Sequence, residues 1–251
     1  MCLKRGRTLL QYAISPAVWL GVWQLASMAV GMDLLLPSPM AVAASLWKLA
    51  GTPQFWLSAL FTLGRVCQGV LGGVALGSAL ALLTHFTVWG ERIFAPAIRV
   101  MRATPVVSFI LLVYLWVDRA TIPAVVAGLM VLPILWGNLT VGLESVDRQL
   151  LELARAYRFG RWKTLRLIYL PSLRTHFASG LLNAFGLAWK SGVAAEVICP
   201  PALAIGSRIQ QAKVALETPE LFAWTLVIVA LSLGLEGILR RVVHPREERG
   251  Q

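Results

Sequence analysis

The segment ELARAYRFGRWKTLRLIYLP, residues 152–171, is a basic stretch in the middle of an otherwise apolar chain of 251 residues. Hydrophobic residues make up 57% of the sequence and charged residues only 14%, too few to cover the surface of a soluble domain. Outside this segment, the runs 8–32, 66–90 and 120–143 contain no Asp, Glu, Lys or Arg. Since a helix needs about 20 apolar residues to cross a bilayer, the sequence predicts an all-α integral membrane protein.

About six membrane spans fit the apolar pattern, within a single domain over residues 1–251, because no linker or repeat divides the chain. The first span is predicted to be retained rather than cleaved as a signal peptide, since its apolar run is longer than a usual signal sequence. The third is the least regular, because Arg99 and Arg102 fall in its first turns. The predicted spans are residues 12–32, 63–86, 97–117, 121–142, 175–199 and 221–239.

The positions of Lys and Arg predict the orientation. With the N-terminus inside, seventeen of them lie in inner segments and five in outer segments, and Lys190 remains inside a span. An excess of this kind marks the cytoplasmic side of membrane proteins. We therefore expect both termini and the segment of about 144–174 to be cytoplasmic. The same clustering at span ends explains the net charge of +11 without nucleic acid as a partner.

Within that segment, apolar residues from Leu150 to Tyr157 follow the i, i+3, i+4, i+7 spacing of one helix face. A second short face begins at Trp162, and Pro171 is predicted to end it. The pattern indicates two short amphipathic helices joined at Gly160. One interpretation places them on membrane lipid, with the basic residues at anionic headgroups. The other docks them into a groove of a cytoplasmic partner.

The same residues resemble the EAA loop of bacterial binding-protein-dependent ABC importers, which runs E-A-A, three residues, G, nine residues, I, one residue, L-P. Arg158 occupies the glycine position of this motif, and Gly160 lies two residues later. The matching positions are Glu152, Leu153 and Ala154 at E-A-A, and Ile168, Leu170 and Pro171 at I-x-L-P. The stretches RATPVVSFILLVYLW at 102–116 and AWKSGVAAEVI at 188–198 are similar to the nitrate/sulfonate/taurine branch of these permeases.

The resemblance implies a type I ABC importer permease fold in the bacterial inner membrane, usually as a homodimer. It implies an ATP-binding cassette ATPase dimer, which would bind ATP and Mg²⁺, and a solute-binding protein that delivers a small polar or anionic solute of the sulfonate, nitrate or vitamin-precursor type. This chain has no phosphate cradle of the form G-x-x-x-x-G-K-[ST], so we expect neither ATPase activity nor a cofactor in it. The residues implied in ATPase coupling are Glu152, Leu153, Ala154, Tyr157, Arg158, Gly160, Arg161 and Trp162.

Three polar residues in the fifth predicted span are candidates for the translocation path, because charge inside a membrane is costly. Lys190 and Glu196 are about 120° apart around the helix and therefore poorly placed to pair with each other. Asn183, seven residues before Lys190, shares its face. We expect all three to line the path, with Lys190 attracting an anionic solute. The alternative for Lys190 is an ion pair between helices or extension towards the outer surface.

Gly69, Gly73 and Gly77 form a stripe of small residues that predicts close helix packing, either within the chain or in a dimer. Two rival functions are weaker. An ion-coupled secondary transporter predicts inverted repeats and midplane ion ligands, and a membrane-embedded enzyme predicts clustered His, Asp or Glu. Neither pattern is visible, and the scattered residues His85, His176 and His244 predict no metal site.

Overall fold

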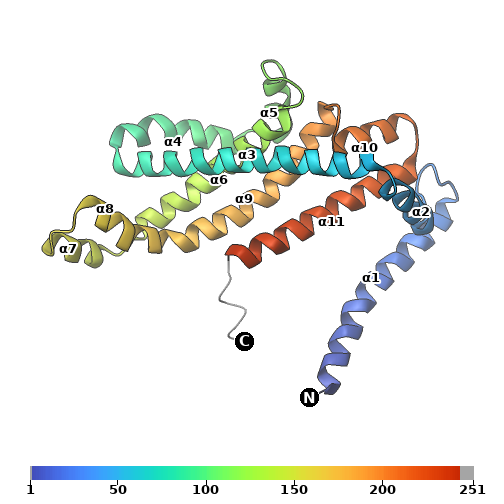
Figure 1. The fold of residues 1–251 in the computed structure, drawn as a ribbon, viewed down its shortest axis with the longest axis horizontal. Helices are drawn as coiled ribbons and strands as arrows, with labels where there is room; N and C mark the ends of the chain where they lie inside the picture. The colour runs from blue at the N-terminus through green and yellow to red at the C-terminus, as the bar shows by residue number, and fades with distance from the viewer. Residues whose placement is uncertain (1, 244–251) are drawn as a thin grey trace.

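The computed structural model describes residues 2–243, with side chains from residue 15 onward. The predicted inner charges Arg246 and Arg249, together with His244, lie outside the described residues. The described chain is helical and contains no strand (Figure 1). Its elements are α1 Cys2–Val30, α2 Pro39–Ala50, α3 Pro53–Phe86, α4 Val88–Ala103, α5 Val106–Tyr114, α6 Ile122–Glu144, α7 Arg148–Ala156, α8 Arg161–Thr164, the π turn η1 Leu165–Tyr169, α9 Leu170–Ile198, α10 Ile205–Val214 and α11 Thr218–Val243.

Helices α3, α6 and α9 form the core of the molecule. One cluster of buried side chains draws Val66 from α3, Val131 from α6 and Trp189 from α9. The central helix, α6, contains no charged residue before Glu144 and buries side chains around most of its circumference. A helix that is apolar on all sides is stable only when it is surrounded, which explains why α6 lies between α3 and α9.

The glycine stripe of α3 packs against α6. A Cβ atom added at Gly73 would lie 2.6 Å from the Cβ of Val131 and 2.7 Å from the Gly128 carbonyl oxygen, closer than atoms can approach. Gly69 and Gly77 likewise face backbone atoms of α6. Small residues at this spacing let two backbones approach closely. The prediction of close packing within the chain is confirmed.

Three described helices, α3, α6 and α11, are long and apolar enough to cross a membrane. Helices α4 and α5 add a fourth span only if they are counted as one span bent by 107°. The third span predicted over 97–117, which Pro105 was expected to interrupt, is therefore two helices that meet at a sharp bend. Thr104 adopts an extended conformation, because the residue before a proline is disfavoured in a helix and Pro105 has no amide to continue the hydrogen bonding.

The predicted total of six spans also requires α1 and α9. Both contain 29 residues, a length of about 43 Å at 1.5 Å per residue, but α9 carries the charged residues Arg174, Lys190 and Glu196. In Figure 1, α1 points away from the bundle and meets the rest of the chain near α2. Its described side chains are largely exposed, among them Trp19 and Leu25.

Coupling segment and candidate transport path

The coupling segment, defined here as residues 148–169, extends from one end of the molecule (Figure 1). Asp147 caps the start of α7, where its carboxylate accepts a hydrogen bond from the amide of Gln149 at 2.8 Å. At the other end of α7, the amide of Phe159 donates to the Ala154 carbonyl at 2.8 Å and the amide of Arg158 donates to Arg155. These two bonds together are the Schellman motif that closes many helices.

Arg158 lies at the position in this turn that requires a left-handed backbone, with φ of 51°. Glycine is the usual residue there, because a Cβ atom is strained in this conformation. Gly160, where the sequence predicted the joint, has φ of −65° and simply precedes α8. The joint between the two helices is therefore at Arg158, the position at which the EAA motif has glycine. The sequence-based prediction placed this joint two residues too late, at Gly160.

The side chains of the coupling segment divide into a buried set and an exposed set. Ala154 is 4% exposed and packs with Val146 and Ile168. Tyr157 and Trp162, by contrast, are 71% and 75% exposed. The remaining coupling residues implied by the resemblance are also exposed: Glu152, Leu153, Arg158, Gly160 and Arg161.

The coupling segment continues into α9 without a break. The amide of Leu170 donates to the carbonyl of Leu165, five residues earlier, which is the hydrogen bond of a π turn. Pro171 follows in the first turn of α9. The prediction that Pro171 ends a helix is wrong, because the π turn directly before it adjusts the hydrogen bonding around its missing amide and the helix continues.

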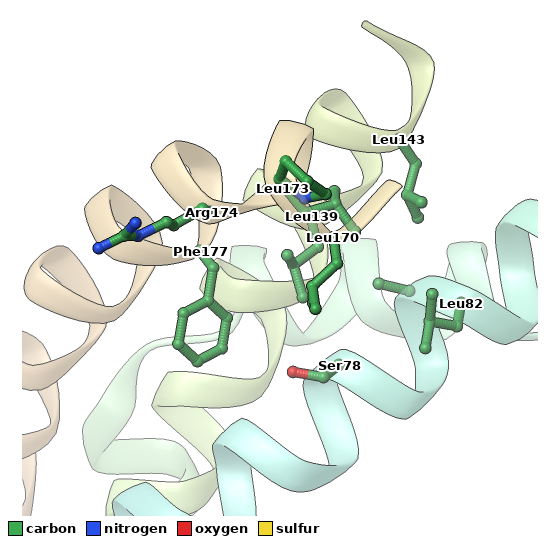
Figure 2. Close-up of a pocket in the computed structure, with 10 residues that line it drawn as sticks. Ser78, Leu82, Leu139, Leu143, Leu170, Leu173, Arg174 and Phe177 are labelled. Atoms are coloured by element: carbon green, nitrogen blue, oxygen red, sulfur yellow. The ribbon is translucent and has the colours of Figure 1, made fainter. Parts of the chain in front are cut away.

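An apolar cavity of about 660 Å³ lies beside this junction, between α3, α6 and α9. Figure 2 shows leucine side chains around it, including Leu139, Leu143 and Leu173, with Ser78 below them. Arg174 points its guanidinium group away from these leucines (Figure 2).

Further along α9, Asn183 and Lys190 are both exposed and share one helix face. Residues seven apart are aligned to within about 20° on a helix. Glu196 does not lie on that face. It is 0% exposed and forms an ion pair with Arg65 of α3, at 3.3 Å between Nη1 and Oε1.

The ion pair is part of a buried network that joins α3, α9 and α10. The hydroxyl of Thr62 donates to Glu196 at 2.8 Å, and the amide of Gly206 donates to the same carboxylate at 3.2 Å. Arg65 also donates to the carbonyl of Leu203 at 2.6 Å. A Cβ atom at Gly206 would overlap the Glu196 side chain, so only glycine fits there.

Sequence reasoning identified Glu196 but missed its partners Thr62, Arg65 and Gly206. A signal existed for Arg65, since it stands one residue before the uncharged run 66–90 and has the opposite sign to Glu196. No pattern connected them, because 131 residues separate the two in sequence. Thr62 and Gly206 had no signal, since both are common residues whose role depends on the tertiary contact.

The described structure is thus a helical membrane domain with a bent helix pair, a polar face on the core helix α9 and a protruding two-helix segment, the architecture of a transmembrane transport subunit. The chain belongs to the family of binding-protein-dependent transport system inner membrane components, which matches residues 73–247. It is the membrane subunit of an ABC importer of the inner membrane and is not itself catalytic. Membership of this family excludes the alternative function of an ion-coupled secondary transporter.

Several known proteins resemble the chain over most of its length. The aliphatic sulfonates transport permease SsuC of Escherichia coli is 30% identical over 73% of this chain and 70% of its own. The riboflavin transport permease RibX of Chloroflexus aurantiacus is 31% identical over 83% and 79%, and the E. coli taurine permease TauC is 24% identical over 92% and 86%. A crystal structure of an amino acid ABC transporter has the same fold, with a TM-score of 0.64 and 20% identity over 81% of this chain and 97% of that chain.

Proposed function

We propose that this permease forms the path for a small anionic solute together with a second copy of itself, and that an ATP-binding cassette ATPase docks on the coupling segment. The ATPase binds ATP and Mg²⁺ and hydrolyses the nucleotide. The observation that carries the proposal is the exposure of Tyr157 and Trp162 on a protrusion with a defined backbone. Large aromatic side chains in such a position are typical anchors of a protein interface.

The connection to α9 supports a mechanical role for the coupling segment. Because α8, η1 and α9 are continuous, a displacement of Trp162 moves the start of α9 directly. The apolar cavity beside Leu173 leaves space for that movement. The helix that receives the displacement also carries Asn183 and Lys190, so ATP-driven movement of the coupling segment reaches the proposed solute path.

The proposed solute class rests on the exposed face of α9 and on the relatives. Lys190 is a cation at a depth where charge usually serves a cavity or a partner. The names of the relatives describe transport of aliphatic sulfonates, taurine and nitrate, all of which contain oxyanions, and also of riboflavin. A solute-binding protein that delivers an oxyanion fits these observations. We assign a structural role to Glu196, which is buried in its ion pair with Arg65: it holds α9 to α3 and α10.

A second copy is supported by α1. Trp19 and Leu25 are 70% and 68% exposed, and the helix meets the remainder of its own chain mainly near its end, where the Trp23 indole donates to the Pro37 carbonyl at 3.0 Å. The exposed apolar side chains of α1 are covered by another chain or by lipid. We assign part of α1 to the second copy and the rest to membrane lipid.

Co-purification tests the docking proposal. The tagged permease is expressed with the ATP-binding subunit encoded beside its gene, and the variants are Trp162→Ala and Trp116→Ala. Trp116 is the matched control, since it is 78% exposed but lies outside the coupling segment. We expect Trp162→Ala to reduce the recovered ATPase about tenfold or more, as for an aromatic anchor, and Trp116→Ala to leave it unchanged. Equal recovery with both variants would remove the docking role of this segment.

A further inference from the structure

A second, polar cavity of about 300 Å³ lies between α4, α6 and the start of α9. Its volume is at the lower end of small-molecule sites, which suits a small solute. No Asp or Glu contributes to its lining. The residues around it are Arg102, Ile134, Gly137, Asn138, Val141 and His176.

Arg102 reaches this cavity because the third predicted span is broken. The bend after Ala103 places the last turn of α4 beside α6, where the guanidinium Nη1 lies 3.5 Å from the position of a Cβ atom at Gly137. Gly137 is about 10 Å from the end of α6 at Glu144, by the helical rise. Among the described residues, the ion pairs are Arg65–Glu196 and Arg240–Glu236, so Arg102 has no carboxylate partner there.

The other polar groups of the cavity retain free hydrogen-bonding capacity. Asn138 donates one amide hydrogen to the carbonyl of Ile134 at 2.9 Å, which leaves its second hydrogen available. His176 has one ring nitrogen, Nε2, 3.4 Å from the Ser145 hydroxyl. One further donor, the second amide hydrogen of Asn138, therefore stands beside the guanidinium group, with the His176 ring next to it.

The cavity also continues the polar face of α9. His176, Asn183 and Lys190 follow one another at intervals of seven residues, so they share one side of the helix over about 21 Å. The proposed solute path has a cation at Lys190 and a second cationic site at its other end, around Arg102. Guanidinium groups bind planar and tetrahedral oxyanions through two parallel hydrogen bonds.

We propose that Arg102, Asn138 and His176 form an oxyanion site on the transport path and bind the charged group of the solute before its release. This inference rests on the proposed function and names the chemistry of the solute that the path accepts. Arg102 provides the charge and the paired hydrogen bonds, Asn138 provides a directional donor, and His176 forms part of the polar wall beside them. A neutral solute of the same shape can accept hydrogen bonds but gains no attraction between opposite charges, so it binds more weakly.

The test is binding of radiolabelled methanesulfonate to the purified permease–ATPase complex in detergent, at constant ionic strength. Unlabelled nitrate and the neutral analogue dimethyl sulfone serve as competitors. We expect nitrate to compete and dimethyl sulfone not to compete.

Arg102→Gln is expected to weaken methanesulfonate binding about tenfold or more, because a charge-assisted pair of hydrogen bonds is lost. Arg99→Gln is the matched control, because Arg99 and Arg102 are both exposed residues of α4 but only Arg102 lines the cavity; this variant is expected to bind as the wild type does.

Two further variants keep the test decisive if Arg102→Gln does not fold. Arg102→Lys retains the charge but cannot form the two parallel hydrogen bonds, so it should bind methanesulfonate with intermediate affinity. His176→Gln should weaken methanesulfonate binding several-fold. Equal binding by wild type, Arg102→Gln and Arg99→Gln would overturn the site, as would equal competition by dimethyl sulfone. Recovery of the ATPase with each variant is measured separately. A wild-type complex that assembles but binds no anion contradicts the oxyanion site alone, whereas failure to assemble contradicts the proposed function.

Discussion

At the scale of single residues, Arg158 shows that a motif position can keep its backbone conformation while losing its usual side chain. The Schellman hydrogen bonds from Arg158 and Phe159 hold the turn, and the residue accepts a left-handed conformation that costs a non-glycine residue about 1–2 kcal/mol. Because the strain is confined to this turn, removing it should change the stability of the turn more than the stability of the whole fold.

We predict that Arg158→Gly stabilises this turn by about 0.5–1 kcal/mol, because glycine adopts positive φ without strain but is more flexible when unfolded. Arg158→Ala removes the same charge but keeps a Cβ atom, so it should give no gain. Amide hydrogen exchange of the peptide 150–160 measures the difference as slower exchange in the glycine variant. Identical exchange in the glycine and alanine variants would show that the turn is unstrained.

Sequence reasoning at this scale recognised that Arg158 replaces the motif glycine but placed the joint at Gly160. Glycine is only a propensity signal for a turn, and the position of the turn was decided by the apolar contacts of Ala154 with Val146 and Ile168. Those contacts join residues from α7, from the loop before it and from η1, which no local pattern reveals.

At the scale of helices, the contact between α3 and α6 depends on the absence of side chains on one face of α3. Gly73 faces Val131, whereas a Cβ atom at the neighbouring Gly72 would have no other atom within 4 Å. The two glycines therefore differ in environment although they are adjacent in sequence. Replacing each of the two glycines by alanine therefore separates the effect of helix packing on stability from the effect of helix propensity.

Gly73→Ala is predicted to destabilise the permease by about 1–3 kcal/mol, since it overpacks a close helix contact. Gly72→Ala should be neutral or slightly stabilising, because alanine favours helix and meets open space. Thermal unfolding in detergent would show the midpoint of Gly73→Ala lowered by roughly 2–10 °C. Similar midpoints for both variants would mean that α3 and α6 are not in close contact in the membrane.

The Arg65–Glu196 pair provides a second prediction for the helices. Arg65→Met leaves a buried carboxylate without its cation, which should cost about 3–5 kcal/mol, whereas the double replacement Arg65→Met, Glu196→Met should cost less. A double-mutant cycle on unfolding midpoints measures the coupling. Additive losses from the two single variants would indicate that the charges do not interact.

The apolar pattern predicted spans within α3, α6 and α11, because membrane helices must satisfy their backbone hydrogen bonds internally whatever their neighbours are. The bent pair α4 and α5 was not predicted. Pro105 disfavours a continuous helix, but the 107° change of direction follows from where Ile98 and Ile110 pack against α6. The oxyanion cavity depends on that change of direction and was for the same reason invisible in the sequence.

At the scale of the whole molecule, the orientation in the membrane remains a prediction from the distribution of Lys and Arg. The described structure separates the two sides clearly, since the coupling segment lies at one end of the bundle and α2 at the other (Figure 1). Exposed lysines occur on both, at Lys163 and Lys48. They are suitable positions for labels.

We predict that a membrane-impermeant thiol reagent labels Lys48→Cys in intact cells with a permeable outer membrane and labels Lys163→Cys only after lysis. The background carries serine at positions 2, 67 and 199 so that the introduced thiol is the only one in the chain. Mass shift on gels reads out the labelling. The reverse pattern would place the coupling segment outside and would exclude a cytoplasmic ATPase partner.

The pair of Arg65 and Glu196 also has a consequence for biosynthesis. The ribosome makes Arg65 first, and the 131 residues before Glu196 take roughly 10 s to translate. Throughout that interval α3 is present in the nascent chain while its counter-charge does not yet exist. The cation must be held meanwhile by water and lipid phosphate at the membrane surface, as long basic side chains commonly are. We therefore expect helix α3 to reach its final depth only late in synthesis, when α9 and α10 arrive and enclose the guanidinium group.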